Sequence, residues 1–285
     1  HNRIMDKYYV LGNPISHSKS PRIHGLFAQQ TGQKINYESQ LVRLGDFENV
    51  LRDLQARGVK GCNVTVPFKE QAYTWCPQKT PRAKWAQAGN TIRFDAEAGA
   101  LLENTDGTGL VRDVLQNAGF TLQDKRILLL GAGGAAAGVL GPLLDTQPAA
   151  LAIANRTSER AVRLVASHRA YVNALAPNTR LEALPWAEMA TVGAFDVVIN
   201  ATAASLGGED LALPEHLFLP GALAYDMMYG PPAAGFLDWA RGHGAEGRDG
   251  LGMLVEQAAE SFYFWRGLRP DTAPVLQTLR AELSV

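Results

Sequence analysis

The feature that most restricts the fold of this chain is a glycine-rich turn at residues 131–136, with the sequence GAGGAA. An apolar strand pattern at 126–130 precedes the turn, and a helix pattern that reaches Leu144 follows it. In the pattern G-x-G-x-x-G/A, the first glycine permits a tight turn and the second lets the backbone approach a pyrophosphate. The small last residue lets the helix pack closely, and the free amides at the helix start bind the anion. The turn therefore predicts a dinucleotide site in an α/β fold.

The segments around this turn alternate between strand-like and helix-like patterns. Strand patterns cover residues 126–130, 151–154, 195–201 and 223–227, and helix patterns cover 108–118, the stretch from the turn to Leu144, and 158–167. Parallel strands that are joined by right-handed helical crossovers form a doubly wound sheet. We therefore expect a Rossmann-like nucleotide domain over residues 106–248.

A similar alternation comes before this domain. Strand patterns cover 7–11, 35–41 and 61–66, and helix patterns run from Ser20 to Gly32 and over 47–57. Ser20 suits a helix N-cap, because Pro21 then takes the first helical position. After residue 248, helix patterns cover 251–267 and 272–283. We expect an open-sheet substrate domain over residues 5–105 and 249–285, with the C-terminal helices packing back on it. Residues 1–4 precede Met5 and are expected to be a vector remnant.

Composition excludes several classes of function. The formal net charge is −1, which gives no electrostatic basis for binding nucleic acid or an anionic membrane. Residues 127–144 are uncharged, but five glycines and Pro142 argue against a membrane span there. The two cysteines, Cys62 and Cys76, form no CxxC motif and have no histidine cluster nearby, so we expect no disulfide and no metal. We expect a cytoplasmic monomer or homodimer that binds a small molecule.

The residues after the strand at 151–154 indicate which dinucleotide binds. Enzymes that use NAD usually carry an acidic residue there, which binds the ribose 2′-hydroxyl. This chain has Asn155, Arg156 and Thr157 instead, followed by Arg160. Two guanidinium groups can bind a 2′-phosphate, and no carboxylate repels it. The sequence therefore favours NADP; alternatively, both arginines are solvated residues at a helix start.

Lys69 lies just after a strand pattern, where α/β enzymes often place chemically active groups. The strand contains the β-branched residues Val64, Thr65 and Val66, and Pro67 ends it because proline cannot donate to a strand ladder. A cationic donor together with a dinucleotide site indicates reduction of a carbonyl. A solvated surface lysine is the alternative interpretation.

Several motifs together resemble the shikimate dehydrogenase family. The resemblance covers nearly the whole chain in order and includes motifs that are specific to that family. Members reduce 3-dehydroshikimate to shikimate with NADPH. The motifs are residues 12–21 (GNPISHSKSP), 63–69 (NVTVPFK), 89–91 (GNT), 104–107 (NTDG), 131–136, 155–157 (NRT) and 249–258 (DGLGMLVEQA).

The resemblance implies roles for individual residues. Lys69 and Asp106 match the family's catalytic pair, in which a carboxylate orients a lysine that faces the developing oxyanion. The resemblance does not decide which of the two transfers the proton. The positions that match substrate ligands are Ser18 and Ser20, at the carboxylate end, together with Thr65, Asn90, Tyr229 and Gln257. The positions that match cofactor ligands are Gly131, Ala132, Gly133, Gly134, Ala135, Asn155, Arg156, Thr157, Arg160, Met227 and Gly250.

One loop departs from the family pattern. In addition, the family pattern gives no role to two histidines. After Thr202 the family usually has serine and glycine, whereas this chain has Ala203 and Ala204. Lost hydroxyls beside the cofactor would alter NADPH affinity without affecting the catalytic pair. His17 and His24 lie within or near the first motif, but the ligands there are serines, so we interpret both histidines as structural.

We expect an NADP-dependent shikimate dehydrogenase, an oxidoreductase that acts in aromatic amino-acid biosynthesis. A quinate/shikimate dehydrogenase with relaxed cofactor use is the nearest alternative, although Arg156 and Arg160 disfavour NAD. A non-catalytic NADPH-binding regulator on the same fold need not keep Lys69 and Asp106 together. An enzyme similar to methylenetetrahydrofolate dehydrogenase shares the two-domain plan but does not explain the serine motif at Ser18 and Ser20.

Overall fold

The computed structural model describes residues 5–94, 97–202 and 211–284. Contacts between Cα atoms divide the chain into two compact units. The first unit contains the chain up to Gly109 and from Val255 onward, and the second contains Leu110–Leu254. The chain passes between the units inside helix α5 (Asp106–Arg112) and helix α10 (Leu251–Arg266). Each unit is built around its own sheet.

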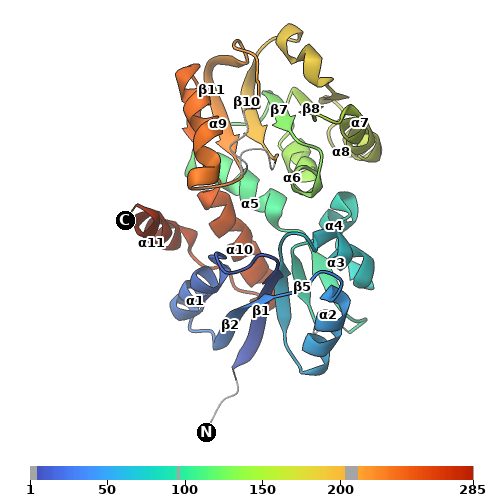
Figure 1. Cartoon of the computed structure of the whole chain (residues 1–285), viewed down its shortest axis with the longest axis vertical. Helices are drawn as coiled ribbons and strands as arrows, with labels where there is room; N and C mark the ends of the chain where they lie inside the picture. The colour runs from blue at the N-terminus through green and yellow to red at the C-terminus, as the bar shows by residue number, and fades with distance from the viewer. Residues whose placement is uncertain (1–4, 95–96, 203–210, 285) are drawn as a thin grey trace. The chain divides into compact units, whose positions relative to one another are not determined.

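Within its described residues, the first unit has a six-stranded mixed sheet with the order β2-β1-β3-β5-β6-β4. Figure 1 labels β1, β2 and β5 of this sheet. β1 is parallel to β2 and to β3, whereas β5 is antiparallel to β3 and to β6. The strands are β1 (Asp6–Gly12), β2 (Ile35–Leu41), β3 (Gly61–Val64), β4 (Gln78–Lys79), β5 (Thr91–Arg93) and β6 (Leu101–Glu103).

Amphipathic helices cover this sheet. In α2 (Phe47–Ala56), Phe47, Leu51 and Leu54 recur on one face and are fully buried, because their spacing follows the helical period. Helix α10 from Val255 onward and helix α11 (Thr272–Leu283) belong to this unit, and α11 contacts α1. This confirms the expectation that they return to the first part of the chain. The other helices are α1 (Ser20–Thr31), α3 (Lys69–Trp75) and α4 (Pro81–Ala86).

The second unit contains a six-stranded sheet in its described residues, with the order β12-β11-β10-β7-β8-β9 and every strand pair parallel. This confirms the doubly wound, Rossmann-like fold. Every residue of β8 is buried, as expected for a strand with helices on both faces of its sheet. The strands are β7 (Arg126–Leu130), β8 (Ala150–Ala154), β9 (Arg180–Ala183), β10 (Phe195–Asn200), β11 (Phe218–Asp226) and β12 (Glu246–Arg248).

The helices of the second unit pack on the strands and on one another. Phe236 and Leu237 of α9 join a core with alternate residues of β7, including Leu128 and Leu130. Helix α6 contacts α8, and α7 contacts β8 and β9. The helices are α6 (Gly134–Asp145), α7 (Ser158–Ser167), α8 (Arg169–Leu175) and α9 (Pro231–Gly242). None of the described helices has the length and apolar character that crossing a membrane requires.

Several local expectations were wrong. Helix α1 begins at Ser20 itself, and the oxygen that accepts from the Ser20 backbone N–H is Ser18 Oγ, at 3.2 Å. Strand β3 ends at Val64, two residues earlier than expected, and Lys69 is the first residue of α3. The helix expected over 108–118 begins at Asp106 and changes to a π-helix over Asp113–Asn117. The short elements β4, β5 and β6 lack a clear sequence pattern and were missed.

Candidate active site

Lys69 and Asp106 form an ion pair in the first unit. The distance between Lys69 Nζ and Asp106 Oδ2 is 2.7 Å, and the side chains are 24% and 13% exposed. Each is the first residue of its helix, α3 or α5. The backbone N–H of Asp106 donates to Asn104 Oδ1 at 3.1 Å, so the start of α5 is fixed by a neighbouring side chain. The pair is thus held in place but still reaches solvent.

Asn90 connects this pair to helix α10. Asn90 is 3% exposed, and its side-chain nitrogen lies 3.1 Å from Asp106 Oδ1, 2.8 Å from Thr105 Oγ1 and 3.0 Å from Gln257 Oε1. Its side-chain oxygen accepts from the Thr105 backbone N–H at 2.9 Å and from the Thr91 hydroxyl at 3.0 Å. One carboxylate oxygen of Asp106 therefore contacts Lys69 and the other contacts Asn90.

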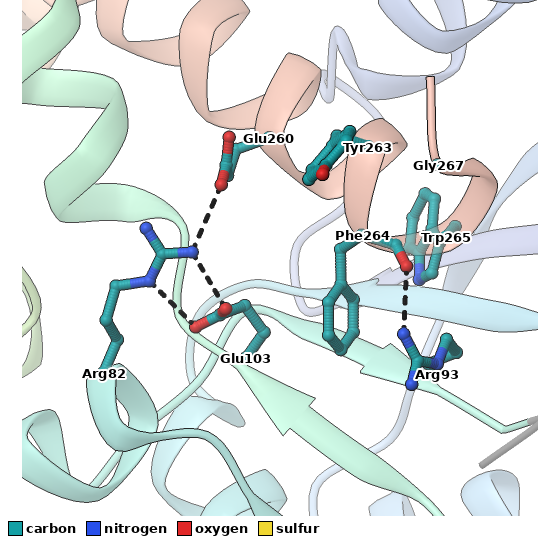
Figure 2. A pocket seen from close by; sticks show the side chains of 8 residues that line it. All are labelled: Arg82, Arg93, Glu103, Glu260, Tyr263, Phe264, Trp265 and Gly267. Carbon is teal, nitrogen blue, oxygen red and sulfur yellow. Dashed lines mark hydrogen bonds and ion pairs between the residues drawn. The ribbon is translucent and has the colours of Figure 1, made fainter. Parts of the chain in front are cut away.

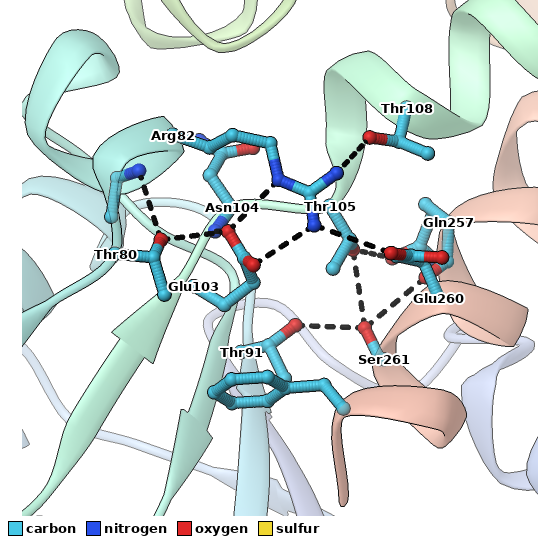
Figure 3. Close-up of polar contacts among 12 residues, drawn as sticks. Thr80, Arg82, Thr91, Glu103, Asn104, Thr105, Thr108, Gln257, Glu260 and Ser261 are labelled. Atoms are coloured by element: carbon cyan, nitrogen blue, oxygen red, sulfur yellow. Dashed lines mark hydrogen bonds and ion pairs between the residues drawn. The ribbon is translucent and has the colours of Figure 1, made fainter. Parts of the chain in front are cut away.

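Hydroxyl groups extend the polar cluster behind Asn90, as Figure 3 shows in part. Ser261 Oγ lies 2.7 Å from Thr91 Oγ1 and 3.1 Å from Thr105 Oγ1. The Asn63 amide donates to Thr91 Oγ1 at 3.2 Å, and Asn63 Oδ1 accepts from the Tyr37 hydroxyl at 2.6 Å. Thr105 lies inside a motif noted in the sequence, but only the adjacent Asp106 was given a role. No sequence signal marked Ser261.

The serines of the first motif lie near the other end of this cluster. Burial raises the pKa of Tyr37 well above its ordinary value, and a hydrogen bond with Ser20 partly opposes this rise. Ser20 is thereby linked to Asn63 through Tyr37. Thr65 follows β3 directly, and its methyl group packs against Gly12, where an added Cβ would lie only 2.4 Å away. The structure therefore brings Asn90 and Gln257 into direct contact with the ion pair or its partners, and links Ser20 through intermediate side chains.

The glycine-rich turn lies between β7 and α6 of the second unit. Gly131 has φ +112° and an added Cβ would approach Ala201 O to 3.0 Å, so only glycine suits this position. Gly133 is the N-cap of α6, and apart from the adjoining backbone no atom of the described residues lies within 4 Å of a Cβ placed on Gly133 or Gly134. The backbone at the start of this 12-residue helix is therefore open to an anion. These residues fit a pyrophosphate.

Asn155, Arg156, Thr157 and Arg160 follow β8, the strand beside β7. The Asn155 amide donates to Thr157 O at 3.0 Å, which closes the turn before α7. Arg156 and Arg160 are exposed, and the Arg156 guanidinium lies 5.8 Å from the ring centre of Trp186. The carboxyl ends of the parallel neighbours β7 and β8 lie at one edge of the sheet, so the turn that precedes α7 and the glycine turn lie at the same edge. This donor set fits a dinucleotide with a 2′-phosphate.

Models of known families match three parts of the chain. They are described as shikimate dehydrogenase substrate binding domain (residues 10–92), shikimate/quinate 5-dehydrogenase (113–207) and shikimate 5′-dehydrogenase C-terminal domain (250–280). The NADP(+) shikimate dehydrogenase of Acidovorax sp. (strain JS42) is 54% identical over 98% of this chain and 97% of that protein. The chain belongs to the NADP-dependent shikimate dehydrogenase family.

Solved structures agree with this membership of the shikimate dehydrogenase family. The shikimate 5-dehydrogenase of Thermus thermophilus, in complex with NADP(H) and shikimate, has a TM-score of 0.83 and 29% identity, over 97% of this chain and 99% of that one. An Ael1 enzyme from Pseudomonas putida has a TM-score of 0.86 and 42% identity, over 96% and 98% of the two chains. The family and the two-sheet fold expected from the sequence are thus confirmed.

Tyr229, Met227 and Gly250 lie together in the second unit of this family member. The Gly250 N–H donates to Met228 O at 2.8 Å, and a Cβ on Gly250 would lie 2.2 Å from Met227 O. Burial raises the pKa of Tyr229. The neighbouring Asp226 was given no role in the sequence analysis. Burial raises its pKa to about 6, while hydrogen bonds from the Met228 N–H and the Asn200 amide oppose that rise.

The loop with Ala203 and Ala204, which departs from the family pattern, lies outside the described residues. No three His, Cys, Asp or Glu side chains of the described residues are grouped so that they could hold a metal ion.

His24 is fully buried in the first unit and stacks on Tyr37, with ring centres 4.4 Å apart. Burial lowers its pKa from 6.5 to about 3. Between pH 6.5 and about 3, His24 is therefore protonated in the unfolded chain but neutral in the folded chain. The stability contribution of neutral His24 is complete above pH 6.5 and is lost as the pH falls towards 3.

We expect His24→Phe to reduce the acid sensitivity of the fold. Phenylalanine keeps the stacking on Tyr37 but cannot be protonated. On going from pH ~7.5 to ~5, the free energy of unfolding of the variant should fall by about 2 kcal/mol less than that of the parent. Urea unfolding at both pH values measures this difference, with exposed His17→Gln as the matched control. Equal losses in parent and His24→Phe would contradict the buried neutral state.

Proposed function

We propose that this chain catalyses the reversible NADPH-dependent reduction of 3-dehydroshikimate to shikimate. The observation that carries the proposal is the Lys69–Asp106 ion pair, at 2.7 Å, beside the side chains of Asn90 and Gln257. Reduction of a ketone adds a hydride to carbon and a proton to oxygen. NADPH, when bound, supplies the hydride. The Lys69 ammonium stabilises the negative charge on the ring oxygen, and the ion pair supplies the proton.

The polar residues around the pair suit a hydroxylated ring acid. In the proposal, Asn90, Thr65 and Gln257 bind ring hydroxyls. Ser18 and Ser20 bind the carboxylate at the start of α1, where a helix N-terminus favours an anion. Asp106 keeps the Lys69 ammonium oriented, since its other oxygen is fixed by Asn90. Tyr229 is proposed as a further substrate contact.

The second unit is proposed to bind the dinucleotide. The backbone amides of residues 131–135 hold the pyrophosphate, because the start of α6 is open and carries no side chain at Gly133 or Gly134. Arg156 and Arg160 bind the 2′-phosphate, with Asn155 and Thr157 shaping the turn. Met227 and Gly250 flank the nicotinamide. No described residue of the chain is assigned to a metal.

We also propose that the protein works in the reducing cytoplasm, as a monomer or homodimer. Cys62 and Cys76 are free and buried in the first unit. Burial raises the pKa of Cys76 to about 12, and also raises that of Cys62, so both thiols stay protonated. Inert, unpaired thiols are typical of proteins that fold without disulfides.

The experiment that tests the activity follows NADPH absorbance with 3-dehydroshikimate and purified protein. We expect turnover with NADPH that exceeds turnover with NADH, and oxidation of quinate with NADP⁺ that is slower than oxidation of shikimate. Lack of turnover at micromolar enzyme would overturn the proposal. Quinate oxidation as fast as shikimate oxidation would instead favour the quinate/shikimate alternative.

A further inference from the structure

We propose that Arg82 is a positioning residue, which holds the Asp106 segment and the Gln257 helix in the geometry needed for reaction. This inference rests on the proposed function, because it assigns Arg82 a task towards two of its residues. Arg82 lies in α4, and its side-chain hydrogen bonds go to groups other than Lys69 and Asp106. Its effect would therefore act through the groups that it binds.

The guanidinium of Arg82 binds three segments of the first unit at once (Figure 3). Its Nε and Nη2 donate to the two carboxylate oxygens of Glu103 at 3.2 and 2.9 Å, in a bidentate arrangement. Nη2 also donates to Glu260 Oε1 at 3.2 Å, and Nη1 donates to Thr108 Oγ1. Helix α4 is thereby joined to β6, to α5 and to α10.

The contact with Glu103 continues to Asp106 through one intermediate residue. Glu103 is the last residue of β6, and its Oε1 also accepts from the Asn104 backbone N–H at 2.8 Å. The Asn104 side chain in turn accepts from the Asp106 backbone N–H at 3.1 Å and donates to Ala88 O at 3.2 Å. Arg82 therefore fixes the Glu103 carboxylate. That carboxylate in turn holds the Asn104 turn, from which Asp106 projects.

The contact with Glu260 fixes the other side of the cluster. Glu260 follows Gln257 by three residues in α10, so both side chains lie on neighbouring turns of one helix face. Glu260 also accepts from Arg269 at 2.7 Å. Because Arg82 Nη2 bonds to both Glu103 and Glu260, one nitrogen joins the helix that carries Gln257 to the strand that leads into the Asp106 turn, in addition to the direct contact of Gln257 with Asn90.

The energetics favour a positioning role that only a guanidinium can fill. The Glu103 and Glu260 side chains are each 8% exposed, so removing Arg82 takes the shared counter-charge from two buried carboxylates, of which Glu260 keeps its ion pair with Arg269. Burial lowers the pKa of Arg82, but the two carboxylates outweigh this and raise it above the ordinary value. A lysine would keep the charge but could not bind three segments in a planar fork.

A cavity makes the position of the Arg82 guanidinium accessible from solvent. It has a volume of about 510 Å³, and its lining includes Arg82, Glu103 and Glu260 at one end and Arg93 at the other (Figure 2). Arg93 donates to Phe264 O at 3.2 Å and lies over the Phe264 ring. In Arg82→Ala, a free guanidinium ion could therefore enter from solvent and occupy the position of the missing guanidinium group.

The test combines Arg82→Ala and Arg82→Lys with chemical rescue. We expect Arg82→Ala to lower kcat for shikimate oxidation by about 10- to 100-fold, while the KM for NADP⁺ changes less than about twofold. Guanidinium chloride at millimolar concentration should restore at least about a fifth of the lost kcat, and equal sodium chloride should not. Arg82→Lys should give an intermediate kcat. The control Arg93→Ala, in the same cavity, should keep kcat within about twofold.

Each outcome decides for or against the positioning role. A folded Arg82→Ala protein with parental kcat would overturn it, as would a loss of kcat that sodium chloride restores equally well. If Arg82→Ala does not fold, Glu260→Gln serves instead. That variant should raise the KM for shikimate at least about fivefold with little change in the KM for NADP⁺, and an unchanged KM for shikimate would overturn the role. Turnover by the parent in the same assay separates these results from a failure of the proposed function.

Discussion

Replacing Lys69 by alanine should lower kcat for shikimate oxidation by at least about a hundredfold, which corresponds to about 2.7 kcal/mol of lost transition-state stabilisation. The reason is that, in the proposed mechanism, the charge which Lys69 stabilises on the ring oxygen develops only during reaction. The KM for shikimate should therefore change much less than kcat. Steady-state kinetics over a range of shikimate and NADP⁺ concentrations measures both constants.

Two further variants make this experiment specific. Lys84→Ala removes an exposed lysine from α4 and should leave kcat within about twofold. Asp106→Asn keeps the size of the side chain but removes the charge that orients Lys69 at 2.7 Å, so it should also lower kcat strongly. A Lys69→Ala protein that shows only a raised KM would make Lys69 a binding residue.

The double substitution Arg156→Ala/Arg160→Ala should raise the KM for NADPH by at least about a hundredfold. Each guanidinium is expected to contribute about 1.5–3 kcal/mol through charged hydrogen bonds to the 2′-phosphate. NADH lacks this phosphate, so its KM should stay within about threefold of the parental value. The preference for NADPH over NADH would then largely disappear. Initial rates at varied NADPH and NADH with fixed 3-dehydroshikimate measure the effect.

Arg163 provides the matched control for this pair. It is exposed on the same helix, α7, one turn beyond Arg160, and its replacement by alanine removes one charge of the same kind. Arg163→Ala should therefore change the KM for NADPH by less than about twofold at ordinary ionic strength. If Arg163→Ala raised the KM for NADPH by half or more of the free-energy effect of the double substitution, general attraction rather than a phosphate site would explain the binding.

The parts of the fold that were predictable have strong local signals. The β7–turn–α6 segment combines an apolar strand with glycines whose conformation other residues avoid, and Gly131 has the positive φ that this implies. The small strands β5 and β6 have three residues each and were missed, because so short a segment shows no reliable period. The antiparallel placement of β5 could not be derived for the same reason.

The residues of the candidate site were predictable only where they lie within a family motif. Lys69 and Asp106 are 37 residues apart, and pattern alone does not bring them within 2.7 Å. The resemblance supplied that pairing. Ser261 and Arg82 were missed because a serine in an amphipathic helix and an arginine near a proline are common in any soluble protein. Their roles depend on partners from distant segments, which local sequence does not show.

The Asn90 carboxamide has a consequence for substrate choice. Its nitrogen carries two protons but faces three oxygen atoms, on Thr105, Asp106 and Gln257. Two protons cannot form three strong bonds at once, and the Thr105 hydroxyl also donates to Gln257 Oε1 only at 3.4 Å, so the contacts in this cluster compete with one another. A substrate hydroxyl in the proposed site could replace one of these competing contacts, whereas a deoxygenated ring offers no group that could do so. Discrimination of this kind depends on the hydroxyl groups of the ring more than on the shape of the ring.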